Sequence, residues 1–127
     1  MSNLTNKKIL RLFISQPMNN IPIDEINNKR NEIVNRIKNL NLYDDIKVVN
    51  DIEKPKGLEI NAGRLWYLGA SIQEMDNCDL IIFADGYDKA NGCMIEYRTA
   101  KSYDVPFLFE DENLEDHFKM ILNHLNK

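Results

Sequence analysis

Two polar loops hold the side chains whose types and spacing could support chemistry. One loop, residues 15–20, reads Ser-Gln-Pro-Met-Asn-Asn, and the other, residues 85–92, carries Asp85 and Asp88 and leads into Glu96. If Glu96 is ionised, its carboxylate could act as a nucleophile. Glu96 is therefore a candidate catalytic residue, and Asp85 and Asp88 are the carboxyl groups of the loop that precedes it.

The first loop suits the binding of a polar or anionic group. Ser15, Gln16 and Asn19 offer a hydroxyl and two amides, with Met18 between them, where a helix is expected to begin. Free backbone N–H groups and the helix macrodipole favour an anion at such a point. A plain strand-to-helix turn with local Ser and Asn caps accounts for the same residues.

The second loop combines a flexible backbone with polar side chains. Gly92 permits close approach of a ligand to the backbone, and Lys89 and Asn91 lie beside it in the sequence. We expect Glu96 in the first turn of the helix that follows. The dipole at that end lowers the pKa of a carboxyl group, whereas burial raises it, so the sign of the net shift stays open. The alternative is a glutamate that stabilises only its own helix.

Other polar and aromatic residues have two interpretations each. Trp66 and Tyr67 could stack on a nucleobase, or they could flank a core stripe. Arg30 could reach a phosphate from the first loop, or it could lie on a solvated helix face. His117 and His124 are spaced for one face of the last helix, but no further ligands accompany them, so neither a metal site nor a cofactor is expected.

The elements that must position these residues alternate between strand and helix. Short apolar runs predict strands, and apolar residues at three- and four-residue spacing predict helices. The strands are expected at Ile9–Ser15, Ile46–Val49, Leu80–Ala84 and Val105–Phe109. The helices are expected at Asp24–Leu40, from about Leu65 to Asn77, from about Gly92 to Tyr103, and from a cap at Asn113 with Asp116 onward.

This order predicts a single α/β domain over residues 1–127. We expect a flavodoxin-like or Rossmann-like three-layer sandwich, with a mostly parallel sheet of four to five strands and helices on both faces. Ligands bind such folds at the carboxyl ends of the strands, near a topological switch point. Both polar loops follow strands, so the fold predicts that they form one site.

Composition limits the classes of partner that we expect this protein to bind. The 127 residues carry a formal net charge of -4, which argues against binding of a DNA or RNA polymer. No apolar run approaches the roughly 20 residues of a membrane span, and residues 1–8 lack a secretion signal, so we expect a cytoplasmic protein that does not enter a membrane. Cys78 and Cys93 are interpreted as reduced thiols.

Three stretches of the sequence carry a recognisable pattern. The first strand ends in Phe-Ile-Ser-Gln-Pro-Met, residues 65–72 read Leu-Trp-Tyr-Leu-Gly-Ala-Ser-Ile, and Cys-Asp-Leu-Ile-Ile-Phe at 78–83 is followed by Asn-Gly-Cys-Met-Ile-Glu at 91–96. Together they resemble the nucleoside 2-deoxyribosyltransferase superfamily, in particular its short bacterial and phage branch. The similarity extends from about Leu10 to Phe109, and the Asp-strand-loop-Gly-x-x-x-Glu block is its most specific part.

The resemblance implies a reaction at the N-glycosidic bond of a small-molecule nucleoside or nucleotide. The glutamate matching Glu96 would attack the anomeric carbon, and a second base or water would then take the sugar, as in retaining glycosidases. Asp88 or Asp85 would protonate the leaving base. The resemblance also implies a homo-oligomer. We expect the substrate contacts to come from Ser15, Gln16, Met18, Asn19, Trp66, Ser71, Lys89, Asn91 and Gly92.

Two positions depart from the family pattern. Ser71 stands where characterised members carry an aspartate important for sugar binding and catalysis, and Ala90 stands where the related nucleotide N-glycosidases carry a phosphate-binding serine. These departures motivate an alternative, a non-catalytic module that binds a nucleotide or a nucleotide-derived signal. A structural or partner-docking α/β domain is a third interpretation.

Overall fold

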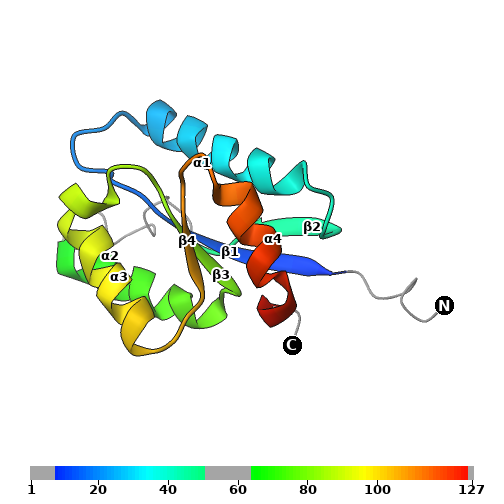
Figure 1. Cartoon of the computed structure of the whole chain (residues 1–127). Helices are drawn as coiled ribbons and strands as arrows, with labels where there is room; N and C mark the ends of the chain where they lie inside the picture. Colours follow the sequence, from blue (N-terminus) through cyan, green and yellow to red (C-terminus); the bar gives the residue numbers. More distant parts are fainter. Residues whose placement is uncertain (1–7, 51–63, 126–127) are drawn as a thin grey trace.

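The sheet is built from four short parallel strands. In this computed structural model, which describes residues 8–50 and 64–125, they are β1 (Ile9–Ser15), β2 (Asp45–Val48), β3 (Leu80–Phe83) and β4 (Phe107–Phe109). Their order across the sheet is β2-β1-β3-β4, and each neighbouring pair is parallel (Figure 1). The α/β prediction and the mostly parallel sheet are therefore confirmed.

Helices cover both faces of this sheet. Helices α1 (Ile23–Lys38) and α4 (Leu114–Leu125) lie on one face, and α2 (Arg64–Glu74) and α3 (Asn91–Ser102) lie on the other (Figure 1). Two short 3-10 turns, η2 (Met75–Asn77) and η3 (Tyr87–Lys89), precede β3 and α3. The result is the three-layer, flavodoxin-like or Rossmann-like arrangement expected from the sequence. Within the described ranges, no helix has the length and apolar character to cross a membrane.

Strand alternation divides the apolar side chains into two cores. Leu12 and Ile14 of β1 point to the face covered by α1 and α4, where they join Phe118, whereas Phe13 points to the opposite face and joins Phe83. All four residues of β3 are buried, as an uninterrupted apolar run predicts for a strand covered on both faces. The two cores hold the carboxyl ends of β1 and β3 at fixed positions.

The switch point of the sheet lies between β1 and β3. The chain runs from β1 to β2 on one side and returns to β3 on the other side, so the connections diverge at the carboxyl ends of these two strands. Ser15 pairs in register with Phe83, and the Ala84 N–H donates to the Ser15 carbonyl at 2.8 Å. The two polar loops therefore leave the sheet side by side, where α/β proteins bind ligands.

Several predicted boundaries were wrong in detail. Helix α3 begins at Asn91, so Glu96 is its sixth residue and lies beyond the first turn, where the dipole acts most strongly. Strand β4 begins only at Phe107, after Pro106, which has no N–H to give to a ladder. Leu65, the first of the apolar residues whose three- and four-residue spacing predicts this helix, lies in the first turn of α2 and is 81% exposed.

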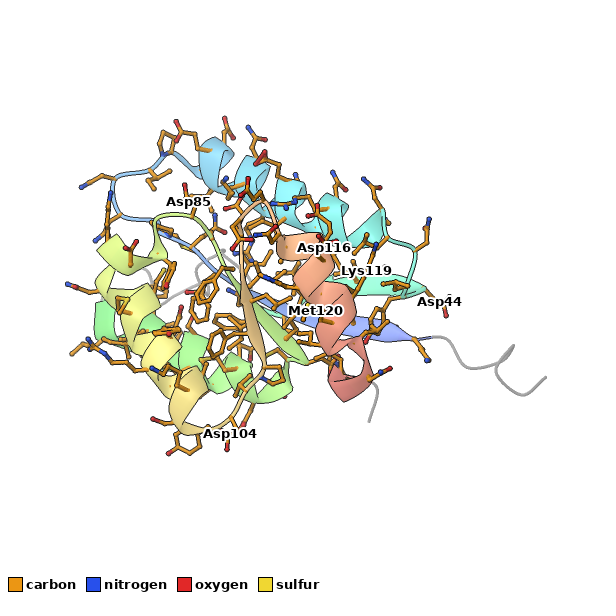
Figure 2. The ribbon with its side chains drawn as sticks, in the orientation of Figure 1. Asp44, Asp85, Asp104, Asp116, Lys119 and Met120 are labelled. Carbon is orange, nitrogen blue, oxygen red and sulfur yellow. The ribbon has the colours of Figure 1, made fainter. Side chains whose placement is uncertain are left out.

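The packing of α4 gives a direct test of the core on the α1 side. Phe118 is fully buried, whereas Met120 on the same helix is 74% exposed and points away from the sheet (Figure 2). Phe118→Ala should lower the free energy of unfolding by about 3–5 kcal/mol, because it removes buried apolar surface and leaves a cavity. Met120→Ala should change it by less than about 0.5 kcal/mol. Urea denaturation measures both, and equal costs would contradict this packing.

Candidate functional site

A buried carboxyl group lies at the switch point. Glu96 faces inward from α3 and is only 7% exposed, and Ser15, the last residue of β1, is fully buried. The Ser15 hydroxyl donates to Oε1 of Glu96 at 2.6 Å. A short bond of this kind is typical of a hydroxyl that donates to a charged acceptor. The bond joins the carboxyl end of β1 to the helix that follows β3.

Two further side chains complete this cluster, which we call the Glu96 cluster: Ser15, Ser71, Cys93 and Glu96. A hydrogen bond from the Ser71 side chain of α2 lowers the pKa of the Glu96 carboxyl. Cys93 lies one turn before Glu96 on α3, and a hydrogen bond with the Ser15 side chain opposes the effect of burial on the pKa of its thiol. Three elements, β1, α2 and α3, therefore bring hydroxyl, thiol and carboxyl groups to one point.

Burial and hydrogen bonding act in opposite directions on Glu96. Burial raises the pKa of the Glu96 carboxyl above its ordinary value, and the hydrogen bonds from Ser15 and Ser71 lower it, with burial the larger effect. The expected dipole stabilisation does not contribute, because Glu96 lies in the second turn. Among residues 8–50 and 64–125, no Lys or Arg forms an ion pair with Glu96. In the described part of the chain, hydroxyl groups rather than a cation hold this carboxyl.

The two thiols are poor nucleophiles. Burial raises the pKa of Cys93 to about 11, and it raises the pKa of Cys78 to about 12. Both thiols are therefore protonated at neutral pH. Only the thiolate form of a cysteine is a good nucleophile or metal ligand. Within the part of the chain that the structure describes, no group of three or more His, Cys, Asp or Glu side chains is arranged to hold a metal ion. The side chain of His124 lies outside that part.

The first loop divides into an inner and an outer part. Gln16 is buried, and its amide oxygen accepts a hydrogen bond from Arg30 at 2.9 Å while its amide nitrogen donates to the Ile26 carbonyl at 3.3 Å. Met18 is 40% exposed and Asn19 is exposed. Gln16 is therefore engaged inside the protein, and Met18 and Asn19 remain accessible to a ligand.

The second loop carries its charged side chains on the surface. Asp85, Asp88 and Lys89 are exposed, and Figure 2 shows Asp85 on the loop that leaves β3. The Asp85 N–H donates to Oε1 of Glu110 at 2.8 Å, which anchors the start of the loop. Gly86 has a φ of 88°, a conformation that side chains disfavour, and this turn brings the chain into η3. Within residues 8–50 and 64–125, no hydrogen bond joins either aspartate to Glu96, so each stays a predicted proton donor.

Two further predicted substrate contacts, Asn91 and Gly92, are the first two residues of α3. Asn91 is the first residue of the helix and is exposed, and Gly92, half-buried, packs near Leu68 of α2. A Cβ at Gly92 would lie 3.9 Å from Leu68, an ordinary packing distance. Gly92 is therefore not required for helix packing, and close approach of a ligand remains its predicted role.

Two hollows lie near the predicted residues. One, of about 280 Å³, is found at the ends of β3 and β4, where Phe83, Tyr87 and Phe109 are joined by the carboxyl groups of Asp85, Asp88, Glu110 and Asp111. The other, of about 230 Å³, is found on the outside of α2, where Trp66 is joined by Leu65, Gly69, Ala70 and Gln73. Neither hollow includes Glu96 among its described lining residues. Trp66 therefore lines a surface separate from the Glu96 cluster.

Sequence reasoning missed a second buried cluster beside the first loop. We call Gln16, Arg30 and Asn50 the Arg30 network. Arg30 is 8% exposed rather than solvated, and it donates to Gln16 and to the Asn50 carbonyl. The signal was present in the sequence, because Arg30 falls on the same helical stripe as Ile26 and Ile33.

Comparison with known proteins identifies no relative. No protein-family model, no curated protein and no solved structure matches the chain.

The raised pKa of Glu96 predicts how stability depends on pH. The folded protein binds a proton at Glu96 more tightly than the unfolded chain does, so its stability falls as the pH rises from about 4, the ordinary glutamate value, through the folded pKa. Glu96→Gln removes this loss. Its free energy of unfolding relative to wild type should therefore increase between about pH 4 and neutral pH, as measured by urea denaturation.

Glu115 provides a control, because its shifted pKa should change the free energy of unfolding with pH in the opposite direction. Its hydrogen bond and charge pairing with Arg36 hold the pKa of Glu115 at about 2, so its contribution is present above the ordinary glutamate value and is lost as the pH falls toward 2. Glu115→Gln should therefore be less stable than wild type at neutral pH, with the difference vanishing in acid. A Glu96→Gln curve that runs parallel to wild type at all pH values would contradict the assignment for Glu96.

Proposed function

We propose that this protein cleaves or transfers the N-glycosidic bond of a nucleoside or nucleotide, with Glu96 as the nucleophile. The proposal joins the sequence resemblance to nucleoside 2-deoxyribosyltransferases with one observation. A glutamate that is 7% exposed is held by serine hydroxyls at the switch point of a parallel sheet. Such a carboxyl is oriented, shielded from water and placed where ligands of α/β folds bind.

The arrangement suits attack on an anomeric carbon. In the first step a Glu96 carboxylate oxygen forms a bond to C1′, while the C1′–N bond breaks and its electron pair leaves with the base. The transition state carries positive charge on the sugar, which a carboxylate stabilises more strongly in a water-poor site than in bulk water. In the second step an acceptor base or water takes the sugar and regenerates the carboxylate.

The serines have a defined part in this step. Hydrogen bonds from Ser15 and Ser71 lower the pKa of Glu96 and so favour the ionised form that attacks. The Ser15 hydroxyl donates to Oε1, which restrains the orientation of the carboxyl group. Ser71, which replaces the family's aspartate, therefore contributes a hydroxyl to the nucleophile in place of a second charge.

The leaving base needs a proton. Asp85 and Asp88 lie on the exposed loop between β3 and α3, and we propose one of them as the donor. The variants Asp85→Asn and Asp88→Asn would identify the donor. Replacement of the donor should reduce activity more for bases that leave poorly than for bases that leave readily, and replacement of the other aspartate should not.

A second candidate function follows from the pKa of Glu96. Burial raises the pKa of this carboxyl, and a protonated Glu96 would donate a hydrogen bond to a ligand instead of attacking it. The protein would then be a binding module for a nucleotide or a nucleotide-derived signal. In that case ligand should stabilise the protein without being consumed, by about 2.7 kcal/mol at one hundred times its dissociation constant.

Exposed apolar side chains on α2 are compatible with the homo-oligomer that the resemblance implies. Leu65 is 81% exposed and Trp66 is 42% exposed. We propose self-association of the chain, and a monomer mass in light scattering across a concentration series would exclude it.

The reaction is tested by base release. Wild-type protein is incubated with each deoxynucleoside and each 5′-monophosphate, with and without an acceptor base, and the products are separated by chromatography. We expect free base or a new nucleoside from at least one substrate. Glu96→Ala should reduce the rate by about 1,000-fold or more, since removal of a nucleophile has effects of this size.

The matched control is Glu112→Gln, which removes an exposed carboxyl group in the loop after β4. It should leave the rate unchanged. If neither wild type nor Glu96→Ala releases base from any member of the panel, the catalytic proposal fails. Nucleotide-dependent thermal stabilisation of the same inactive protein would then support the binding module, and no stabilisation would reject both.

A further inference from the structure

A buried arginine organises the residues on either side of Ser15. Arg30 projects from α1, and its guanidinium donates through Nη1 to the Gln16 amide oxygen at 2.9 Å and through Nη2 to the backbone carbonyl of Asn50. Nη2 also lies 3.4 Å from Oδ1 of Asn50. A guanidinium group can make these bonds at once because its donors are fixed in a planar fork.

Asn50 extends the pairing of β1 beyond the end of β2. Regular pairing between these strands ends at Leu12 and Val48. Farther along, the Ile14 N–H donates to Oδ1 of Asn50 at 3.0 Å, and Nδ2 of Asn50 donates to the Ile14 carbonyl at 2.7 Å. The Asn50 side chain thus takes the place of a backbone peptide opposite Ile14, and it is buried.

Ser15 is consequently held on both sides. The residue before it, Ile14, is bonded to Asn50, and the residue after it, Gln16, is bonded to Arg30 and to the Ile26 carbonyl. Arg30 connects these two anchors through its own bonds to Asn50 and Gln16. The direction in which the Ser15 hydroxyl points depends on the backbone between the two anchors.

We propose that Arg30 is a positioning residue that acts through Ser15 on Glu96. Its guanidinium fork fixes the backbone of residues 14–16, and the fixed backbone aims the Ser15 hydroxyl at Oε1 of Glu96. The inference rests on the proposed function for its catalytic meaning, but the mechanical link from Arg30 to Glu96 exists in the protein without substrate.

The link is tested by the titration of Glu96 in the free protein. Among the residues that the structure describes, the groups that face this carboxyl are Ser15 from β1, Ser71 from α2 and Cys93 from its own helix. Arg30→Lys keeps the positive charge but loses the fork, so a direct charge effect on Glu96 is minimised. The measurement is the ¹³C shift of the Glu96 carboxyl carbon against pH, assigned by its absence in Glu96→Gln.

Arg30→Lys should raise the midpoint of this titration, because a misdirected Ser15 no longer favours the carboxylate. Ser15→Ala should raise it as well, and adding Arg30→Lys to Ser15→Ala should cause no further rise. Gln16→Met, a milder change that removes one contact of the guanidinium, should move the midpoint in the same direction and serves if Arg30→Lys does not fold.

Arg36→Lys is the matched control. Arg36 lies on the same helix and forms a two-bond pair with Glu115 of α4, so its replacement by lysine also loses a guanidinium fork that links α1 to another helix. It should leave the Glu96 midpoint unchanged. The proposal is overturned if folded Arg30→Lys and Gln16→Met titrate like wild type, or if Arg30→Lys causes the same rise with and without Ser15. Because the titration needs no substrate, an inactive protein would refute the proposed reaction and leave this test intact.

Discussion

The hydrogen bond from Ser15 to Glu96 joins residues 81 positions apart in the sequence, and the order of the strands makes it possible. Strand β1 lies between β2 and β3, so its carboxyl end faces the connection that leads from β3 to α3. The parallel register places Ser15 opposite Phe83, and the two cores keep this register. A slip by one residue would turn Ser15 to the other face of the sheet and remove the donor from Glu96.

The burial of Glu96 opposes ionisation of its carboxyl group. A carboxylate in a water-poor environment interacts strongly with a positively charged transition state, yet the same environment raises the pKa of the carboxyl group. Serine hydroxyls reduce this conflict because they favour the carboxylate without pairing it with a cation. A lysine or arginine at the same place would favour ionisation more strongly but would also weaken the attraction for a cationic sugar. Hydroxyl donors therefore suit a nucleophile of this kind.

Much of the fold follows from short-range patterns. The uninterrupted run in β3 predicted a strand buried on both faces, and the alternation of strands and helices predicted parallel pairing, which the structure confirms. The site was predictable only as two loops that meet. The hydrogen bond by which Ser71 lowers the pKa of Glu96 was not predicted, because the approach of α2 to α3 depends on tertiary packing rather than on local sequence. The interpretation of Arg30 as a solvated residue was wrong. Its charge indicated an exposed position, whereas its place on the apolar stripe of α1 puts it inside the protein.

The central claim is that the Glu96 carboxylate attacks the sugar and forms a covalent intermediate. The anomeric configuration of the product tests this most directly, because two successive displacements retain configuration and one displacement inverts it. A β-deoxynucleoside and an acceptor base are incubated with the protein, and the new nucleoside is examined by ¹H NMR before any equilibration. The β-anomer is the predicted product; the α-anomer, or no product from any acceptor, would contradict the account.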